Sequence, residues 1–393
     1  MGSKDLKKAL ASLVLVSIIL LGLVGASANT GSDVLSQVNS ILKKVEEIRG
    51  LTFKEPPKIV ILTREEAKER FKPGKPDIER MKLEEDVYKM SLLLPPNYPY
   101  VHEKVEQSVG WIAVTTGNTI YIIAENFLSD PDTARRVIAH ESVHVLQKQW
   151  FNAPYGGPTL DTTKAIQAAI EGDADLVADL YCNETGIPIH KITDLYTRDP
   201  VTALGIFPYV FGDRFVAYLY RVGGWRLVNE MYSHLPNTTK VVMFPSLYLR
   251  NWTPTDVRAD VEKLIPKNAT VRHSDRMGAY YVFLIYWGHN ATREESMKMA
   301  RAWDGDWLIM GDVNGTNGTE RFLAWEVLFN TPENATAFAH FLEKIAKNDD
   351  YARFTIRTSG RKVVLLAKKT LSEEKTDERG QEVKVFDLWK GIR

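Results

Sequence analysis

The sequence has little cysteine, no net charge and few histidines, and each shortage narrows what the protein can be. Its single cysteine, Cys182, cannot form an intramolecular disulfide, so stability has to come from core packing and any bound metal. The 50 basic residues balance the 50 acidic ones, so no basic excess would attract a nucleic acid, and we expect no such partner. With only eight histidines, a regular histidine pattern has little chance of arising by accident. The remaining composition, 44% hydrophobic and 25% charged in 393 residues, is globular and allows two domains.

The N-terminal segment carries the features of an export signal. A lysine-rich stretch at 4–8 precedes an apolar run at 9–24, and the A-S-A stretch at 26–28 offers a cleavage site. We therefore expect residues 1–28 to be a signal peptide. The alternative is an uncleaved membrane anchor, because the apolar run approaches the length that spans a bilayer. Cys182 lies too far from this segment to carry the lipid of a lipoprotein. Both alternatives place the mature chain outside the cell, secreted or at the cell surface.

Asparagine sequons support export independently. The chain has eight N-x-T sequons, whereas chance would give about two for this asparagine content. They lie at Asn183, Asn237, Asn251, Asn268, Asn290, Asn314, Asn317 and Asn334. We therefore expect N-linked glycans; the alternative is a threonine-rich loop composition.

The most informative stretch is A-H-E-S-V-H-V-L-Q-K-Q at 139–149, which contains His140, Glu141 and His144 in the order H-E-x-x-H. Residues four apart lie on one face of a helix, so the two histidines can direct their imidazoles to one metal ion. An S-D-P-D stretch just before it offers an N-cap and an early proline, and we expect a helix from about 130 to 150. Zn²⁺ held by two histidines and a carboxylate lowers the pKa of a bound water to about 7, and Glu141 is placed to accept its proton. The alternative is two surface histidines on an amphipathic helix.

A third ligand should lie on a second helix, at 165–181, which is rich in alanine. Acidic side chains in such an apolar helix need a metal or a partner, because an unpaired buried carboxylate is costly. We expect Glu171 to complete the metal site. Asp175 lies one turn later on the same face, where it can accept the second ring proton of a ligating histidine. Asp173 points elsewhere, to solvent or to a helix–helix contact; the alternative for the whole segment is a helix whose acids face solvent.

The two motifs together resemble those of the gluzincin branch of the zincin metallopeptidases, H-E-x-x-H followed by E-x-x-x-D. The resemblance implies an α+β zincin-like fold and one Zn²⁺ on His140, His144 and Glu171. It also implies Glu141 as general base and Asp175 as support for the first histidine. Most of residues 40 to 365 resemble an uncharacterised family of secreted or surface zincin-like proteins of bacteria and archaea. The similar stretches are Arg49-Gly50-Leu51 with the strand after Pro57, H-E-S-V-H-V-L-Q-K-Q-W at 140–150, A-A-I-E-G-D-A at 168–174, P-Y-V-F-G-D-R-F-V at 208–216, Gly223-Gly224-Trp225 and W-D-G-D at 303–306.

Two positions depart from the pattern of this family. Lys240 and Phe244 precede Pro245, where family members tend to carry an acidic residue and then a histidine. If that histidine contributes to a binding site in the relatives, this chain lacks it. The departure therefore concerns the substrate side and leaves the metal ligands intact.

The residue that would stabilise the oxyanion of an attacked carbonyl is open. Gluzincins use a tyrosine or a histidine for this role, and the attacked carbonyl needs such a donor besides the metal. Tyr209, within a family-like P-Y-x-x-G stretch at the start of an aromatic-rich helix, is our first candidate. Its alternative role is core packing. His190, His234 and Tyr155 are the other candidates.

The rest of the pattern indicates an α+β protein with two domains. We expect a zincin-like metallopeptidase domain at 29–254, a C-terminal α+β domain at 255–370 and a charged tail at 371–393. The main expected elements are helices at 33–49, 64–71, 77–90, 209–220, 255–264 and 333–347, and strands at 58–63, 111–115, 119–123, 279–287, 307–310, 322–329, 354–357 and 363–367.

Two functions fit the sequence. The first is an exported zinc metallopeptidase that hydrolyses peptides or proteins, with Glu141 as general base and Tyr209 as oxyanion donor. The second is a non-catalytic binding protein of the cell surface or envelope, built on a zincin scaffold and possessing the same metal ligands. An intact ligand set, His140, His144 and Glu171, favours the enzyme. In either case the N-terminal segment provides any association with a membrane.

Overall fold

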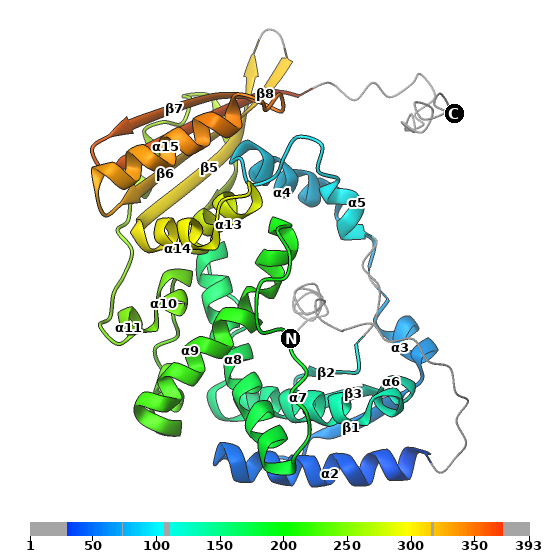
Figure 1. The fold of residues 1–393 in the computed structure, drawn as a ribbon. Helices are drawn as coiled ribbons and strands as arrows, with labels where there is room; N and C mark the ends of the chain where they lie inside the picture. The colour runs from blue at the N-terminus through cyan, green and yellow to red at the C-terminus, as the bar shows by residue number, and fades with distance from the viewer. Residues whose placement is uncertain (1–29, 73, 106–110, 316–317, 372–393) are drawn as a thin grey trace, which may run out of the picture.

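The structure, a computed structural model, describes residues 30–371 apart from 73, 106–110 and 316–317 (Figure 1). The expected signal segment at 1–28 lies outside the described residues, as does the charged tail beyond residue 371. Within the described part of the chain, no helix combines the length and the apolar character that crossing a membrane requires. The fold mixes many helices with two sheets, which confirms the α+β class.

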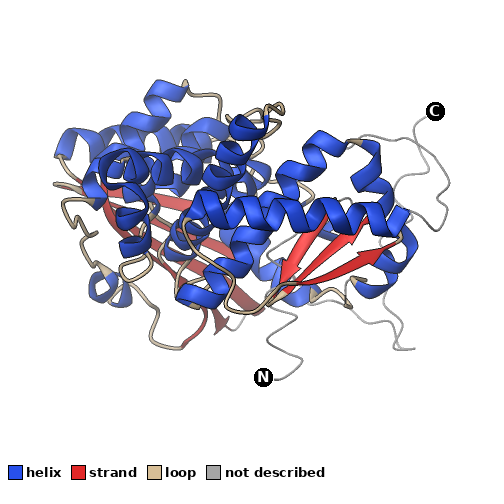
Figure 2. Ribbon diagram, turned by 90° about the horizontal axis from the view of Figure 1, so that it is seen from below, coloured by secondary structure: helices blue, strands red, loops and turns tan. Residues whose placement is uncertain are grey.

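A small sheet with helices packed on it forms the N-terminal part. Its elements are α2 (Thr30–Arg49), β1 (Lys58–Leu62), α3 (Arg64–Arg70), α4 (Ile78–Met90), α5 (Tyr100–Val105), β2 (Ala113–Thr116), β3 (Thr119–Ile123), α6 (Ala124–Ser129) and α7 (Pro131–Phe151). Strand β1 runs parallel to β3 and β2 pairs antiparallel with it, so the order is β1-β3-β2 and β2 is an edge strand. Apolar side chains of α2 and α7 share one core with Ile120 and Ile122 of β3. Figure 2 shows α2 in front of this sheet.

Helix α7 is followed by two more long helices, α8 (Leu160–Thr185) and α9 (Pro200–Met231). Helix α7 begins where the Asp130 side chain accepts a hydrogen bond from the Thr133 amide at 3.2 Å. Helix α8 ends before Gly186, whose φ of 73° suits glycine. Helices α8 and α9 cross at two glycines, because a Cβ added to Gly172 would lie 2.2 Å from the carbonyl oxygen of Gly212. The two backbones are therefore in direct contact beside Glu171.

A five-stranded antiparallel sheet in the order β4-β5-β6-β8-β7 dominates the C-terminal part. The elements are α10 (Thr239–Met243), α11 (Pro245–Tyr248), α12 (Arg258–Glu262), β4 (Ala269–Asp275), α13 (Ala279–Gly288), α14 (Arg293–Ala302), β5 (Trp303–Gly315), β6 (Gly318–Phe329), α15 (Pro332–Ala346), β7 (Arg353–Ser359) and β8 (Lys362–Thr370). Figure 1 shows α15 lying across strands of this sheet. Helices thus cover one face of it.

The expected strand at 279–287 is wrong, because these residues form helix α13. Every residue from Ala279 to Tyr286 is buried, so the helix is apolar on all sides. A helix of that kind shows no 3.6-residue period, and its β-branched and aromatic residues look like those of a buried strand. The error therefore comes from the complete burial of the helix.

One large core joins the N-terminal helices to the C-terminal sheet. It contains Phe207 and Phe211 of α9, Tyr280 and Phe283 of α13 and Trp325 of β6. The Tyr280 ring lies 4.3 Å from that of Phe207 and 5.4 Å from that of Phe211, measured between centroids. The expected border between residues 254 and 255 therefore runs through a shared core, and the domain limits stay a prediction.

Candidate metal centre

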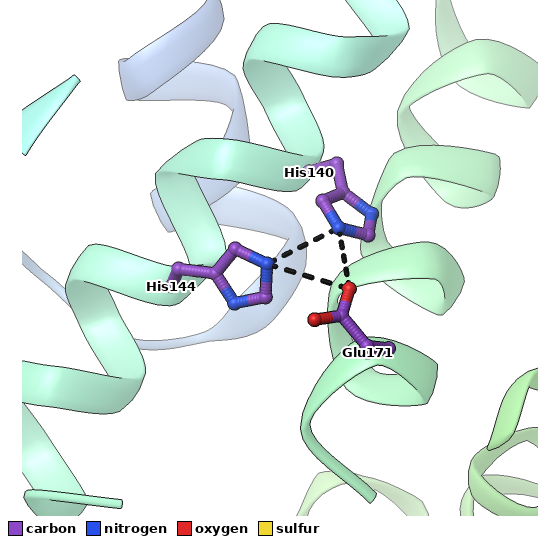
Figure 3. Close-up of side chains that lie close together, drawn as sticks. All are labelled: His140, His144 and Glu171. Carbon is purple, nitrogen blue, oxygen red and sulfur yellow. Dashed lines mark hydrogen bonds and ion pairs between the residues drawn. The ribbon is translucent and has the colours of Figure 1, made fainter. Parts of the chain in front are cut away.

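Helices α7 and α8 bring His140, His144 and Glu171 to one point. The two Nε2 atoms lie 3.2 Å apart, and the Oε2 atom of Glu171 lies 3.1 Å from Nε2 of His140 and 3.6 Å from Nε2 of His144. Figure 3 shows the three side chains pointing toward one another from the two helices. They are the group that could hold a metal ion among the described residues. The structure therefore places the three expected ligands together.

The geometry of this group suits a zinc ion. Two imidazole nitrogens and one carboxylate oxygen are donors that zinc accepts, and ligands at zinc's usual bond lengths in a tetrahedron lie about 3.3 Å apart. The three measured separations, 3.1, 3.2 and 3.6 Å, cluster around that value. The side chain of Glu171 is only 2% exposed, so its charge needs a buried cation. A zinc ion fits both the spacing and the charge.

The pKa values of the group follow from burial and mutual charge. Burial lowers the pKa of His140, but hydrogen bonds to Asp175 and Glu171 outweigh it and raise that pKa to about 10. The pKa of His144 is also raised, since the charge of Glu171 outweighs burial. Burial raises the pKa of Glu171, yet the charge of His144 and the bond to His140 hold it well below its usual range. Histidine protons thus balance Glu171, and a divalent cation would displace them because ligating imidazoles are neutral.

Asp175 contacts His140, the histidine that the sequence predicts it to support. Its Oδ1 atom accepts a hydrogen bond from Nδ1 of His140 at 3.2 Å and another from Nη2 of Arg136 at 2.7 Å. Because a carboxylate only accepts, Nδ1 of His140 carries the proton and Nε2 is left to face the other ligands. Arg136, which the sequence did not single out, also bonds Asp179 at 2.9 Å.

His144 is held by a residue that the sequence analysis missed, Gln147. The His144 Nδ1–H donates to Oε1 of Gln147 at 2.8 Å, and Nε2 of Gln147 donates to the carbonyl of Ile170 at 2.9 Å. Behind it, Asp173 is fully buried and binds Arg49 of α2 at 2.9 Å. Of the two alternatives for Asp173, the helix–helix contact is therefore the one observed. Both ring orientations depend on neighbours from α7 or α8.

Glu141 lies at the centre with one carboxylate oxygen free of partners. The residue is 8% exposed, and its Oε2 atom is buried without a hydrogen bond among the described residues. Its carbonyl oxygen accepts a hydrogen bond from Oγ1 of Thr115 in β2 at 2.9 Å, which joins the edge strand to α7. An unpartnered buried carboxylate oxygen is costly, so it is expected to have a water or a substrate proton as its partner.

Two tyrosines, Tyr155 and Tyr209, approach the centre. The sequence analysis ranked Tyr209 first, but Tyr155 makes the direct contact with Glu171. The hydroxyl of Tyr155, in the loop between α7 and α8, donates to Oε1 of Glu171. Burial and then the charge of Glu171 raise the pKa of Tyr209 well above its usual value, whereas a hydrogen bond with Tyr155 lowers it. Tyr155 therefore touches a candidate ligand directly, and Tyr209 lies beside it within the range of the same acidic charges.

The other two candidates for the oxyanion donor lie elsewhere. Nδ1 of His190 lies 3.2 Å from Oγ1 of Thr133, near the start of α7, and the carbonyl of His234 accepts a bond from Tyr248 at 2.8 Å. Lys240, one of the departures from the family pattern, is buried with its ammonium 4.2 Å from the centroid of the Trp252 ring. Its ammonium also donates a hydrogen bond to the carbonyl oxygen of Trp303, so the lysine links α10 to the start of β5.

Comparisons with known proteins give two matches. Residues 101–150, which include the H-E-x-x-H motif, match the model of the eCIS core domain. A crystal structure from Chloroflexus aurantiacus, described as a candidate hydrolase with a novel fold, aligns with a TM-score of 0.36 and 13% identity; the alignment covers 64% of this chain and 98% of that one. No curated protein matches the chain. Neither match assigns the chain to a zincin family.

Proposed function

We propose that this protein is an exported, zinc-dependent metallopeptidase that hydrolyses peptide bonds. The observation that carries the proposal is the convergence of His140, His144 and Glu171 beside a buried carboxylate oxygen of Glu141 that has no partner. The first three residues would hold one zinc ion per chain. Glu141 is the residue of α7 that follows His140, which supports a place for its carboxylate at the edge of the same site. Peptides or proteins are the proposed substrates.

The chemistry divides between the metal and the chain. When bound, zinc polarises a carbonyl and makes a water molecule more acidic. Glu141 accepts the proton of the attacking water at its free Oε2 and passes it to the leaving amine, as a general base and then a general acid. The Tyr155 hydroxyl has one proton, which it donates to Glu171 in the structure. In this scheme the hydroxyl turns from Glu171 and donates that proton's hydrogen bond to the oxyanion that develops on the attacked carbonyl. Tyr209, the first candidate from the sequence, positions Tyr155 in this scheme.

Strand β2 supports the assignment of a peptide substrate. It forms an edge of its sheet, and Thr115 ties it to the backbone of Glu141. An extended peptide that paired with this edge would run beside the metal ligands, which is the general mode of β-strand addition. We propose that the substrate is bound in this way.

The signal-like sequence of the N-terminal segment supports export of the protein. We propose that residues 1–28 direct the chain out of the cell, either cleaved or kept as a membrane anchor. Asn183, Asn237 and Asn334 are among the sequons proposed to carry glycans. The localisation is tested by sequencing the N-terminus of the mature protein and by digesting it with a glycosidase.

The test combines metal analysis with peptide digestion. The mature chain is purified, its metal content is measured, and a mixed peptide library is digested with and without a zinc chelator. One zinc per chain together with chelator-sensitive cleavage would support the peptidase. Zinc without cleavage would favour the non-catalytic surface protein, and absence of zinc would refute the site. The control is Glu141→Gln, which we expect to keep the zinc and lose turnover, since only the proton acceptor changes.

A further inference from the structure

The two metal helices carry matching series of charged residues with a spacing of four. Helix α7 has Arg136, His140 and His144, and helix α8 has Glu171, Asp175 and Asp179, all in a four-residue period. Residues four apart lie on one helix face, one turn above another. Helix α7 therefore presents a column of three basic groups to α8, and α8 presents a column of three acidic groups to α7. The columns extend one turn beyond the metal ligands.

The contacts between the columns form three successive rungs, and we call the set the acid–base ladder. His144 meets Glu171 at 3.6 Å, and His140 meets Glu171 at 3.1 Å and Asp175 at 3.2 Å. Arg136 continues the series, with Nη2 at 2.7 Å from Asp175 and 2.9 Å from Asp179. The two helices run in opposite directions, so successive basic groups from His144 to Arg136 meet successive acids from Glu171 to Asp179. His140 and Arg136 each bridge two of these acids. Arg136 thus repeats, one turn away, the arrangement of His140.

Arg136 and His140 share one acceptor atom. Oδ1 of Asp175 accepts hydrogen bonds from Nη2 of Arg136 and from Nδ1 of His140. A guanidinium only donates and a carboxylate oxygen only accepts, so these bonds impose the proton position on the imidazole. Nε2 is then the ring atom that faces Glu171 and His144, and it would become a metal-ligating atom once a cation displaced its proton. The direction of the Asp175 carboxylate is therefore a determinant of the metal geometry.

The arginine itself is fixed by further contacts. Its side chain is 7% exposed, and its Nε and Nη2 atoms bond Asp179 at 3.2 and 2.9 Å. Asp179 is also bound by Lys191, whose ammonium lies 2.9 Å from Asp213 of α9. A buried arginine costs desolvation energy, which the ion pairs with Asp175 and Asp179 offset. The network leaves the guanidinium no freedom to turn from Asp175.

We infer that Arg136 is a positioning residue of the metal centre, which orients His140 through Asp175 as the third rung of the acid–base ladder. The inference rests on the proposed metal centre. It extends the ligand-bearing part of α7 by one turn toward its N-terminus. Arg136 touches neither the proposed ligand atoms nor a substrate, so its effect should appear in metal affinity before it appears in chemistry.

The experiment titrates Co²⁺ into the full chain and follows affinity by competition with a chromophoric chelator, with the visible spectrum as a report on ligand geometry. We expect Arg136→Met to weaken Co²⁺ binding about tenfold and to alter the spectrum, because supporting partners of ligands usually contribute at that level. The matched control is Arg321→Met. Arg321 of β6 is 11% exposed and bridges Asp86 of α4 and Asp312 of β5. The change therefore removes a comparable buried network that does not contact the centre. We expect it to leave Co²⁺ affinity within about twofold.

A double-mutant cycle separates positioning from general destabilisation. If Arg136 acts through Asp175, Arg136→Met should add less than about twofold to the effect of Asp175→Asn. Equal effects in both backgrounds, or Co²⁺ affinity unchanged in Arg136→Met, would overturn the inference while leaving the centre intact. If Arg136→Met does not fold, Arg136→Lys takes its place in the experiment, since lysine keeps the charge but lacks the two-pronged guanidinium. Wild-type Co²⁺ affinity in Arg136→Lys would also overturn the inference. A wild-type chain that binds no Co²⁺ would refute the proposed centre and this inference together.

Discussion

The crossing of α8 and α9 allows a sharp prediction for Gly172→Ala. Its new Cβ would lie 2.2 Å from the carbonyl oxygen of Gly212 and 2.4 Å from the carbonyl carbon. Both atoms are backbone, so no side chain can turn aside, and the helices must separate by about 1 Å to reach van der Waals distance. Glu171 is the preceding residue and would move with the backbone. Metal ligands tolerate a displacement of about 0.5 Å, so the shift exceeds the tolerance of the site.

Two free-energy terms set the expected stability of this variant. Overpacking typically costs about 1–3 kcal/mol, and replacing glycine by alanine within a helix returns about 1 kcal/mol. Because both clashing atoms are backbone, the overpacking cost should lie at the upper end of that range, so the net loss is about 2 kcal/mol and the chain should still fold. Zinc affinity should nevertheless fall by at least about tenfold, because the ligand is displaced.

The assay is a zinc competition titration combined with thermal unfolding of the metal-free chain. Gly156→Ala is the matched control, since its Cβ would meet only the Thr163 side chain at 3.7 Å, in the loop beside the same site. We expect wild-type zinc affinity in that control. Wild-type affinity in Gly172→Ala would show that the centre does not depend on the close approach of the two helices.

Three further outcomes follow from the site and the core. Tyr155→Phe should keep the zinc and reduce turnover about 100-fold in a peptide cleavage assay, and normal turnover would exclude it as oxyanion donor. Zinc binding at pH 7 should release at least about one proton, because the pKa of His140 is raised to about 10 in the metal-free chain. The apparent zinc affinity should therefore rise with pH. Calorimetry in buffers of different ionisation enthalpy measures the proton release, and zinc binding without proton release would contradict a protonated His140. Truncation after residue 254 should yield a chain that fails to fold by circular dichroism, since the shared core is cut.

The sequence predicted the metal helices well because their signals are local. The expected helix from about 130 to 150 is observed as Pro131–Phe151, with the Asp130 cap and the early proline where the pattern placed them. The three ligands came from a spacing of four within one helix and from an acid in an apolar helix. Both signals survive without knowledge of the tertiary structure. Helix α13 gave no such signal, because burial on every side removes the periodicity.

The neighbours of the ligands could not be predicted, because they depend on how helices pack. An arginine four residues before His140 reads as a solvated charge, and only the pairing of α7 with α8 turns Arg136 toward Asp175. Gln147 has no charge and no motif to mark it. Tyr209 was ranked first because it lies in a family-like P-Y-x-x-G stretch at the start of a helix. The contact of Tyr155 with Glu171 depends on the course of a loop, which the sequence does not specify.

The burial of α13 also sets a time at which the site can be completed. Helices α7, α8 and α9 are synthesised before Tyr280 and Phe283, the side chains against which Phe207 and Phe211 of α9 pack. Until residue 288 has been synthesised, Phe207 and Phe211 lack the cover that α13 provides, so the packing that holds α9 beside α8 is incomplete. A nascent chain therefore carries all three ligands long before it can arrange them. If the proposed centre binds a metal, the ion would be acquired late, after α13 has packed against α9.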